Sequence, residues 1–240
     1  MSGLPPLSGS RRLFWAGVGR IAANAPLLPA WERRDQKALA PRCPEALIRS
    51  TVLLSDAHAI LRNMHQPHAV QVSGALFLAF GQACVNLHFY IDDEAKALFK
   101  DLRPEEWYPL ENFEDVLRVV AARYSDPAPI LEQVGIEMMK FWYEVGPGKQ
   151  HVKRGTDFLR FQTSSEGYYS VIRGDPARIG DFTLVDLNEK EGTAVVRSTT
   201  PFDKDMERGV LRGGMALTQD LFYIDIDNSA DVNTYQIEFH

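Results

Sequence analysis

Three histidines stand close together in the first third of the chain. His58, His65 and His68 follow one another at spacings of seven and three, which can place imidazoles on one face of a helix. Three neutral imidazoles are a donor set that binds zinc. Pro67 interrupts a helix just before His68, however, and no carboxylate stands beside them at a metal-site spacing. We therefore interpret them as solvent-facing or singly hydrogen-bonded histidines and expect no metal site.

A second cluster of candidate ligands lies near the C-terminus. Asp225, Asp227 and Asp231 resemble the start of a calcium-binding loop. Such a loop requires glycine at its sixth position and glutamate at its twelfth, where this chain has Ala230 and Gln236. A β-hairpin turn explains the same aspartates without an ion, so we interpret the segment as a hairpin.

The segment from Gly167 to Gly174 carries the most suggestive side chains. Tyr168 and Tyr169 are followed by Arg173, so two rings could close over an apolar ligand while the guanidinium pairs with a carboxylate on it. The alternative is a helix-to-strand junction in which the tyrosines fill the rim of the core and Arg173 pairs with Asp175 or a backbone carbonyl. The sequence leaves both interpretations open.

No catalytic constellation is recognisable. Neither a Ser/His/Asp or Cys/His arrangement nor a pair of carboxylates stands out. The two cysteines, Cys43 and Cys84, are far apart in sequence, and Cys84 lies in an apolar stretch that should keep its thiol protonated and inert. These observations favour a non-catalytic protein with reduced thiols in the cytoplasm.

The composition excludes several classes of protein. The 240 residues are 45% hydrophobic and 24% charged, which is ordinary for a globular protein that can bury a core without metals or disulfides. A net charge of -6 argues against a general nucleic-acid binder, which needs a basic surface. The longest apolar run, residues 75–80, is far shorter than the roughly 20 residues of a membrane span.

The N-terminal region differs from the rest. No acidic residue occurs before Glu32, and Arg11, Arg12 and Arg20 make the segment basic. Residues 10–24 have the pattern of an amphipathic arm, which could lie on an anionic membrane surface. We favour packing on the arm's own domain or on a symmetry mate. We therefore divide the chain into an N-terminal extension, 1–43, and an α+β domain, 44–240.

Periodicity predicts the elements that position these residues. Apolar residues at helical spacing predict helices, and a change to period two after Asp181 predicts strands with a terminal hairpin. We expect an extended stretch at 70–73 that leads into a buried helix ending at Leu87. The expected helices are 44–64, 92–100, 110–124, 127–145, 158–161 and 203–221. The expected strands are 181–186, 194–196, 222–226 and 235–239.

The order of these elements and several short motifs resemble a known superfamily. The motifs are Val72-Ser73-Gly74, Glu106 to Leu110, Gly167-Tyr168-Tyr169, Ala194-Val195-Val196, Pro201-Phe202 and Arg208-Gly209-Val210. Together they resemble bacterial sensor-type domains of the 4-vinyl-reductase and heme-NO-binding-like superfamily, which are distantly similar in fold to TRAPP vesicle-tethering subunits. The resemblance implies a helical layer on a small antiparallel sheet, an internal apolar cavity, dimerisation through helices and the sensing of small molecules.

The chain also departs from this superfamily. Many relatives carry cysteines near the last helix and in the terminal hairpin, whereas this chain has Asp203, Lys204 and Asp205 in the first region and no cysteine from 225 to 240. Heme binders hold the iron with a histidine of the helical layer, but His88 and His151 are the only near candidates and neither sits in a matching motif. We therefore expect no cofactor and disfavour heme.

These observations predict a regulatory sensor domain that binds an apolar small molecule. No output module is recognisable, so we expect it to act through a protein partner or its own dimer and to bind no nucleic acid. The pocket should lie between the helices of 75–146 and the sheet of 181–239. The expected ligand-binding residues are Phe77, Phe80, Phe113, Leu117, Met138, Phe141, Trp142, Tyr168, Tyr169 and Arg173.

Two alternatives remain open at this stage. The first is a scaffold that uses the N-terminal arm as its interaction surface. The second is an enzyme acting on an apolar substrate, with Tyr169 or His151 as proton donor. The predicted pocket residues could also be no more than core.

Overall fold

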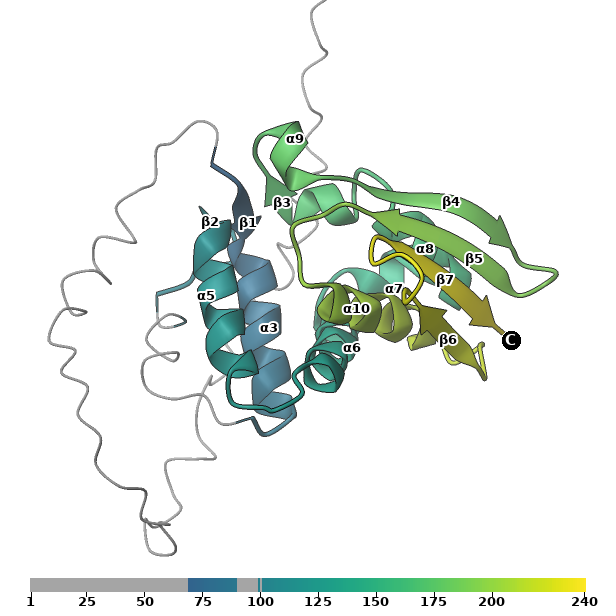
Figure 1. The fold of residues 1–240 in the computed structure, drawn as a ribbon, viewed down its shortest axis with the longest axis horizontal. Helices are drawn as coiled ribbons and strands as arrows, with labels where there is room; N and C mark the ends of the chain where they lie inside the picture. The colour runs from purple at the N-terminus through teal and green to yellow at the C-terminus, as the bar shows by residue number, and fades with distance from the viewer. Residues whose placement is uncertain (1–68, 90–98, 100) are drawn as a thin grey trace, which may run out of the picture.

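The computed structural model describes residues 69–89, 99 and 101–240. Within these ranges the chain folds as two antiparallel sheets with helices packed between them (Figure 1). The predicted α+β class is confirmed. Several predictions fall on residues outside the described ranges. They are the N-terminal extension with its boundary at residue 43, the helix expected at 44–64 and the histidines His58, His65 and His68. Of the helix expected at 92–100, only residue 99 is described. Among the described helices, none has the length and apolarity to cross a bilayer.

A small three-stranded sheet joins distant parts of the chain. Its strands are, in sheet order, β2 (Trp107–Pro109), β1 (Gln71–Ser73) and β3 (Ile172–Arg173). Both pairings are antiparallel. β1 continues directly into α3 (Gly74–Asn86), where the Ser73 hydroxyl accepts a hydrogen bond from the Leu76 amide at 3.3 Å and caps the helix. β2 continues in the same way into α5 (Leu110–Ala121), so this sheet fixes where two core helices begin.

The middle of the chain is helical. Its elements are α6 (Ala128–Val145), α7 (Gly148–His151), α8 (Gly155–Gln162), the 3₁₀ turn η2 (Tyr168–Ser170) and, after β3, α9 (Pro176–Ile179). α6 begins after Pro127 and ends before Gly146-Pro147, because proline suits a first turn and cannot continue a helix. The carboxylate of Asp157 caps the start of α8, where it accepts a hydrogen bond from the Arg154 amide at 2.9 Å.

A four-stranded sheet completes the fold. Its strands are, in sheet order, β4 (Phe182–Asn188), β5 (Thr193–Ser198), β7 (Thr234–Phe239) and β6 (Ile224–Asp227), all antiparallel. α10 (Lys204–Ala216) connects β5 to β6 and lies against the inner face of the sheet, between it and α6 (Figure 1). Ile226, Tyr235 and Ile237 alternate inward and are buried.

The structure differs from the sequence prediction at several elements. The strand predicted at 181–186 should alternate regularly, but a register shift between Leu184 and Asp186 leaves Asp186 exposed and turns Leu187 to the core. The last helix ends at Ala216 rather than Leu221. The strand at Trp107 was not expected, because three residues are too few to display a period. The terminal hairpin and the passage from β1 into α3 are confirmed.

Cys84 should be chemically silent in the folded protein. It lies on the buried face of α3 with no exposed surface, and burial raises the pKa of its thiol to about 12. At pH 8 roughly one thiol in ten thousand would therefore be the reactive thiolate. In a Cys43→Ser variant, a thiol-specific chromogenic disulfide should titrate no thiol in native buffer and one in guanidinium. Rapid reaction in native buffer would contradict the burial of Cys84.

Candidate functional site

A cavity of about 60 Å³ lies where the helices meet the start of β4. Its walls come from α3, α6, α8, α10, the η2 segment and β4. The lining residues are Leu76, Ala79, Met138, Met139, Trp142, Phe158, Phe161, Gln162, Gly167, Tyr168, Val171, Phe182, Phe202, Met206, Glu207 and Val210. The lining is mostly apolar, and its three thioethers can adapt to an irregular ligand. Such a cavity admits a few heavy atoms without rearrangement, and a single-ring ligand requires the flexible thioether side chains to adjust.

Glycines set the distance between the two helices that form its floor. A Cβ on Gly135 of α6 would lie 2.2 Å from the Met206 carbonyl oxygen of α10, and a Cβ on Gly209 would lie 1.9 Å from the Glu132 carbonyl oxygen. Only a residue without a side chain allows this approach of two backbones. The contact fixes the register of α10 on α6 and so places Met206 and Val210 opposite Met138.

Aromatic rings form one wall. Trp142 stacks on Phe161 with ring centroids 5.2 Å apart and meets Phe158 edge-on at 6.1 Å. Tyr168 stacks on Phe182 at 6.0 Å, and its hydroxyl donates to the carbonyl of Ile179. Burial raises the pKa of the Tyr168 phenol, so this ring remains neutral. The wall therefore presents flat apolar surface to the cavity, with the tyrosine's polar end directed elsewhere.

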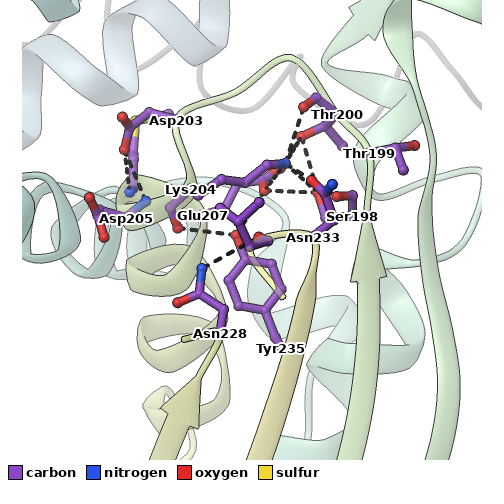
Figure 2. Close-up of polar contacts among 12 residues, drawn as sticks. Ser198, Thr199, Thr200, Asp203, Lys204, Asp205, Glu207, Asn228, Asn233 and Tyr235 are labelled. Carbon is purple, nitrogen blue, oxygen red and sulfur yellow. Dashed lines mark hydrogen bonds and ion pairs between the residues drawn. The ribbon is translucent and has the colours of Figure 1, made fainter. Parts of the chain in front are cut away.

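The opposite side holds a buried carboxylate. Glu207 of α10 is 6% exposed and accepts hydrogen bonds at one oxygen from Ser198 Oγ at 2.8 Å and Lys204 Nζ at 2.9 Å. The Tyr235 hydroxyl lies 3.0 Å from the same oxygen, and Thr200 donates to the other (Figure 2). Burial raises the pKa of Glu207, opposed by Lys204 and the hydroxyl donors. These contacts tie α10 to the ends of β5 and β7.

Three of the ten predicted ligand-binding residues line the cavity: Met138, Trp142 and Tyr168. Phe77, Phe80 and Phe113 are buried instead in an adjoining aromatic cluster of α3 and α5. The half-buried residues Leu117 and Phe141 pack against the core outside the lining. Ligand binding by any of these residues stays a prediction.

The two most polar predicted residues face away from the cavity. Arg173 stacks over the Trp107 ring at 4.4 Å and donates to the side chain of Gln71 at 2.8 Å, on the outer side of the small sheet. Tyr169 donates to Asp181 at 2.6 Å, which raises the pKa of its phenol to about 12. The segment joins a 3₁₀ turn to a strand, and Arg173 pairs with Gln71 rather than with Asp175. A ligand role for Tyr169 and Arg173 stays a prediction.

Glu207 is the functional candidate that sequence reasoning missed. It lies on one helical stripe with Leu211 and Met215, both fully buried, at spacings of four. A carboxylate within an otherwise apolar stripe is a signal of a buried, paired charge. Hydroxyls at Ser198 and Thr200, just before the helix, were the available hint of its partners.

The aspartates of the terminal hairpin serve its turn. Asp227 accepts from the Ser229 amide at 2.9 Å, and Asp231 accepts from the Asn233 amide at 3.0 Å. Throughout the described ranges, His, Cys, Asp and Glu side chains nowhere gather in a group of three that could hold a metal ion. His88 is exposed at the end of α3, and His240 stacks on Tyr223.

Solved structures identify the fold. The chain is similar to an oxygen-binding H-NOX domain related to soluble guanylate cyclases, in its oxygen complex, with 13% identity, a TM-score of 0.53 and coverage of 70% of this chain and 94% of that one. The chain is also similar to an H-NOX protein from S. oneidensis in the Fe(II)NO ligation state, with 12% identity, a TM-score of 0.52 and coverage of 70% of this chain and 98% of that one. A third similar structure, from a study of heme distortion in the H-NOX family, has 13% identity, a TM-score of 0.53 and coverage of 70% of this chain and 94% of that one. No protein-family model and no curated protein matches the chain.

These similarities confirm one expectation and overturn another. The H-NOX-like fold implied by the sequence resemblance is confirmed, whereas the sensor role and the link to 4-vinyl reductases and TRAPP subunits stay predictions. The expectation that the chain uses no cofactor is contradicted, because the solved domains that share its fold are heme proteins that bind oxygen or nitric oxide. The sequence argument failed because it judged the cofactor from single histidines rather than from the fold.

Proposed function

We propose that this chain is a regulatory sensor domain whose central cavity binds a small, predominantly apolar molecule. The observation that carries the proposal is the cavity itself, which is walled by α3, α6, α8 and α10 and lined mainly by aromatic rings and thioethers. Buried apolar cavities of this kind are where proteins bind small ligands. The sensor fold shared with H-NOX domains supports the regulatory part.

Binding is favoured over turnover by the position of the candidate proton donors. The Tyr169 hydroxyl is engaged with Asp181, and a phenol with a pKa of about 12 is a weak acid at neutral pH. His151 lies 3.9 Å from Glu166, outside the cavity lining. Neither group faces the cavity, so a substrate held there would meet neither of them.

Because the solved domains with this fold are heme proteins, heme is the first cofactor to test. The described lining does not fit it as arranged here. Heme iron is usually held by histidine, cysteine, methionine or tyrosinate. Among the described lining residues there is no imidazole or thiol, the three methionine thioethers have no histidine to serve as the opposite ligand, and the neutral Tyr168 donates to Ile179. Lys204 is paired with Glu207 and so is not available to a propionate.

The way in which the domain would pass on its signal is proposed from the sequence. The sensor would report from the cytoplasm through a protein partner or through its own dimer. Removing residues 1–40 tests this proposal, because a sensor that contacts its partner through the extension should lose partner binding or dimerisation while the remaining domain keeps its fold. Circular dichroism reports the fold, and light scattering reports the oligomeric state. An unchanged oligomer and an unchanged partner would remove the extension from the output.

Filling the cavity should abolish ligand binding. Ala79→Leu adds three carbon atoms from α3 into the space, so we expect its affinity for 4-fluorotoluene to fall at least about tenfold, which is the loss of about 1.4 kcal/mol of contact. Ala121→Leu on α5 is the matched control, because Ala121 is half-buried outside the lining. Fluorine NMR measures the apolar probe, and visible absorption measures hemin in parallel.

The two probes, 4-fluorotoluene and hemin, distinguish a cavity for small apolar ligands from a heme site. Binding of 4-fluorotoluene that is lost only in Ala79→Leu supports the cavity as the sensor site. Saturable hemin binding that is equally sensitive to Ala79→Leu places a heme in the same region and requires the walls to move. If neither probe binds the full chain, or if both variants behave alike, the proposal fails.

A further inference from the structure

Four donors from four segments converge on the carboxylate of Glu207. They are Ser198 at the end of β5, Thr200 in the following loop, Lys204 in the first turn of α10 and Tyr235 on β7 (Figure 2). Lys204 also lies 3.1 Å from the Thr200 carbonyl oxygen and 3.0 Å from Ser198 Oγ. Three hydroxyls and one ammonium around a single point form a site suited to an anion.

Glu207 connects this donor cluster to the cavity, because Glu207 lines the cavity and the four donors do not. Glu207 is the only carboxylate among the described lining residues, and both of its oxygens are engaged by the cluster. Glu207 and Lys204 carry opposite charges, so the pair is neutral while both remain. Without the carboxylate, the Lys204 ammonium, on a half-buried side chain that is 19% exposed, would lose the anion with which it is paired, and the hydroxyls would have no common acceptor.

We propose that Glu207 is a specificity-determining residue: its own carboxylate fills an anion site at the cavity wall, so the domain accepts uncharged apolar ligands and rejects those that bear a carboxylate. The inference rests on the proposed function, because it names the ligand class of the same cavity. A ligand carboxylate would meet a like charge in a medium of low dielectric and would find no donor left to pair with it.

The experiment replaces the built-in carboxylate by a soluble one. The wild-type chain should bind 4-fluorotoluene and should bind 4-fluorobenzoate, which has a carboxylate in place of the methyl group, at least about tenfold more weakly. Glu207→Ala should reverse this preference and gain at least about tenfold in affinity for 4-fluorobenzoate, through charge-assisted hydrogen bonds. Fluorine NMR measures both ligands on each protein.

A second readout does not depend on an apolar ligand. Acetate alone should raise the melting temperature of Glu207→Ala and leave that of the wild type unchanged, because only the variant has an empty anion site. The double variant Lys204→Met/Glu207→Met removes both charges and is the matched control, in which acetate should have no effect. If Glu207→Ala folds only when acetate is present, that dependence is the same rescue and supports the proposal.

The outcomes distinguish this inference from the proposed function. If the wild type fails to bind 4-fluorotoluene while acetate rescues Glu207→Ala, the anion site stands and the apolar sensor cavity falls. A Glu207→Ala variant that folds without acetate and gains neither affinity for 4-fluorobenzoate nor stability in acetate overturns the inference. Equal affinity of the wild type for both ligands overturns it as well.

Discussion

Gly209→Ala should lower the free energy of unfolding by about 3 kcal/mol or more, a large loss for the addition of a single methyl group. The new Cβ would lie 1.9 Å from the carbonyl oxygen of Glu132 and 2.7 Å from its carbonyl carbon. These are backbone atoms of α6, and they cannot rotate aside. The two helices would have to separate, which would stretch the 2.9 Å bond from Arg208 Nε to Glu132 and open the floor of the cavity. Urea unfolding measures the loss.

The intrinsic helix propensity of alanine predicts the opposite change in stability for Gly209→Ala, so the measurement distinguishes the two effects. Alanine is favoured over glycine by about 1 kcal/mol within a helix, so relief of the contact would make the variant more stable. Gly81→Ala in α3 is the matched control, because its Cβ would meet only ring carbons of the Phe99 side chain, at 2.9 Å. We expect that variant to stay within about 1 kcal/mol of the wild type. Equal stability of both variants would show that α6 and α10 are not held at the distance described.

The sequence predicts the elements well where a long period is present. The stripe of Phe113, Val116 and Val120 is buried on α5, and the alternation of Tyr235, Ile237 and Phe239 is buried on β7. Periodicity fails where an element is too short to repeat, as in β2 and β3, or where one inserted residue changes the face, as at Val185. The pairing of the short strands depends on tertiary contacts that no local pattern records.

The site is harder to predict than the fold, because a cavity is what remains between packed elements. Phe113 and Met138 are both fully buried apolar residues on helices, yet only Met138 borders the empty space. Which of them does so depends on how closely α10 approaches α6, and that distance is set by Gly135 and Gly209. Of the two polar residues singled out beside the tyrosines and on the apolar stripe, Arg173 lies outside the cavity lining, whereas Glu207 is part of it.

Phe113→Ala should cost about 3–5 kcal/mol of stability, because Phe113 is a core residue outside the cavity lining. It is 1% exposed, and its ring meets those of Phe77 at 5.1 Å, Phe80 at 5.5 Å and Phe202 at 5.9 Å, all near edge-to-face. Truncation would remove three favourable ring contacts together and leave a cavity that rigid helices cannot close. Thermal or urea unfolding of the variant measures the effect.

The matched control is the same substitution on the surface. Phe222 is 97% exposed, so Phe222→Ala should change stability by no more than about 0.5 kcal/mol. Phe113→Leu, which keeps most of the apolar volume, should recover a good part of the loss and should still bind 4-fluorotoluene, because the Phe113 side chain does not reach the cavity. If Phe113→Leu were stable but unable to bind the probe, Phe113 would be a ligand contact, as its place in the sequence first indicated. The cavity would then extend toward α5, beyond the walls formed by α6, α8 and α10.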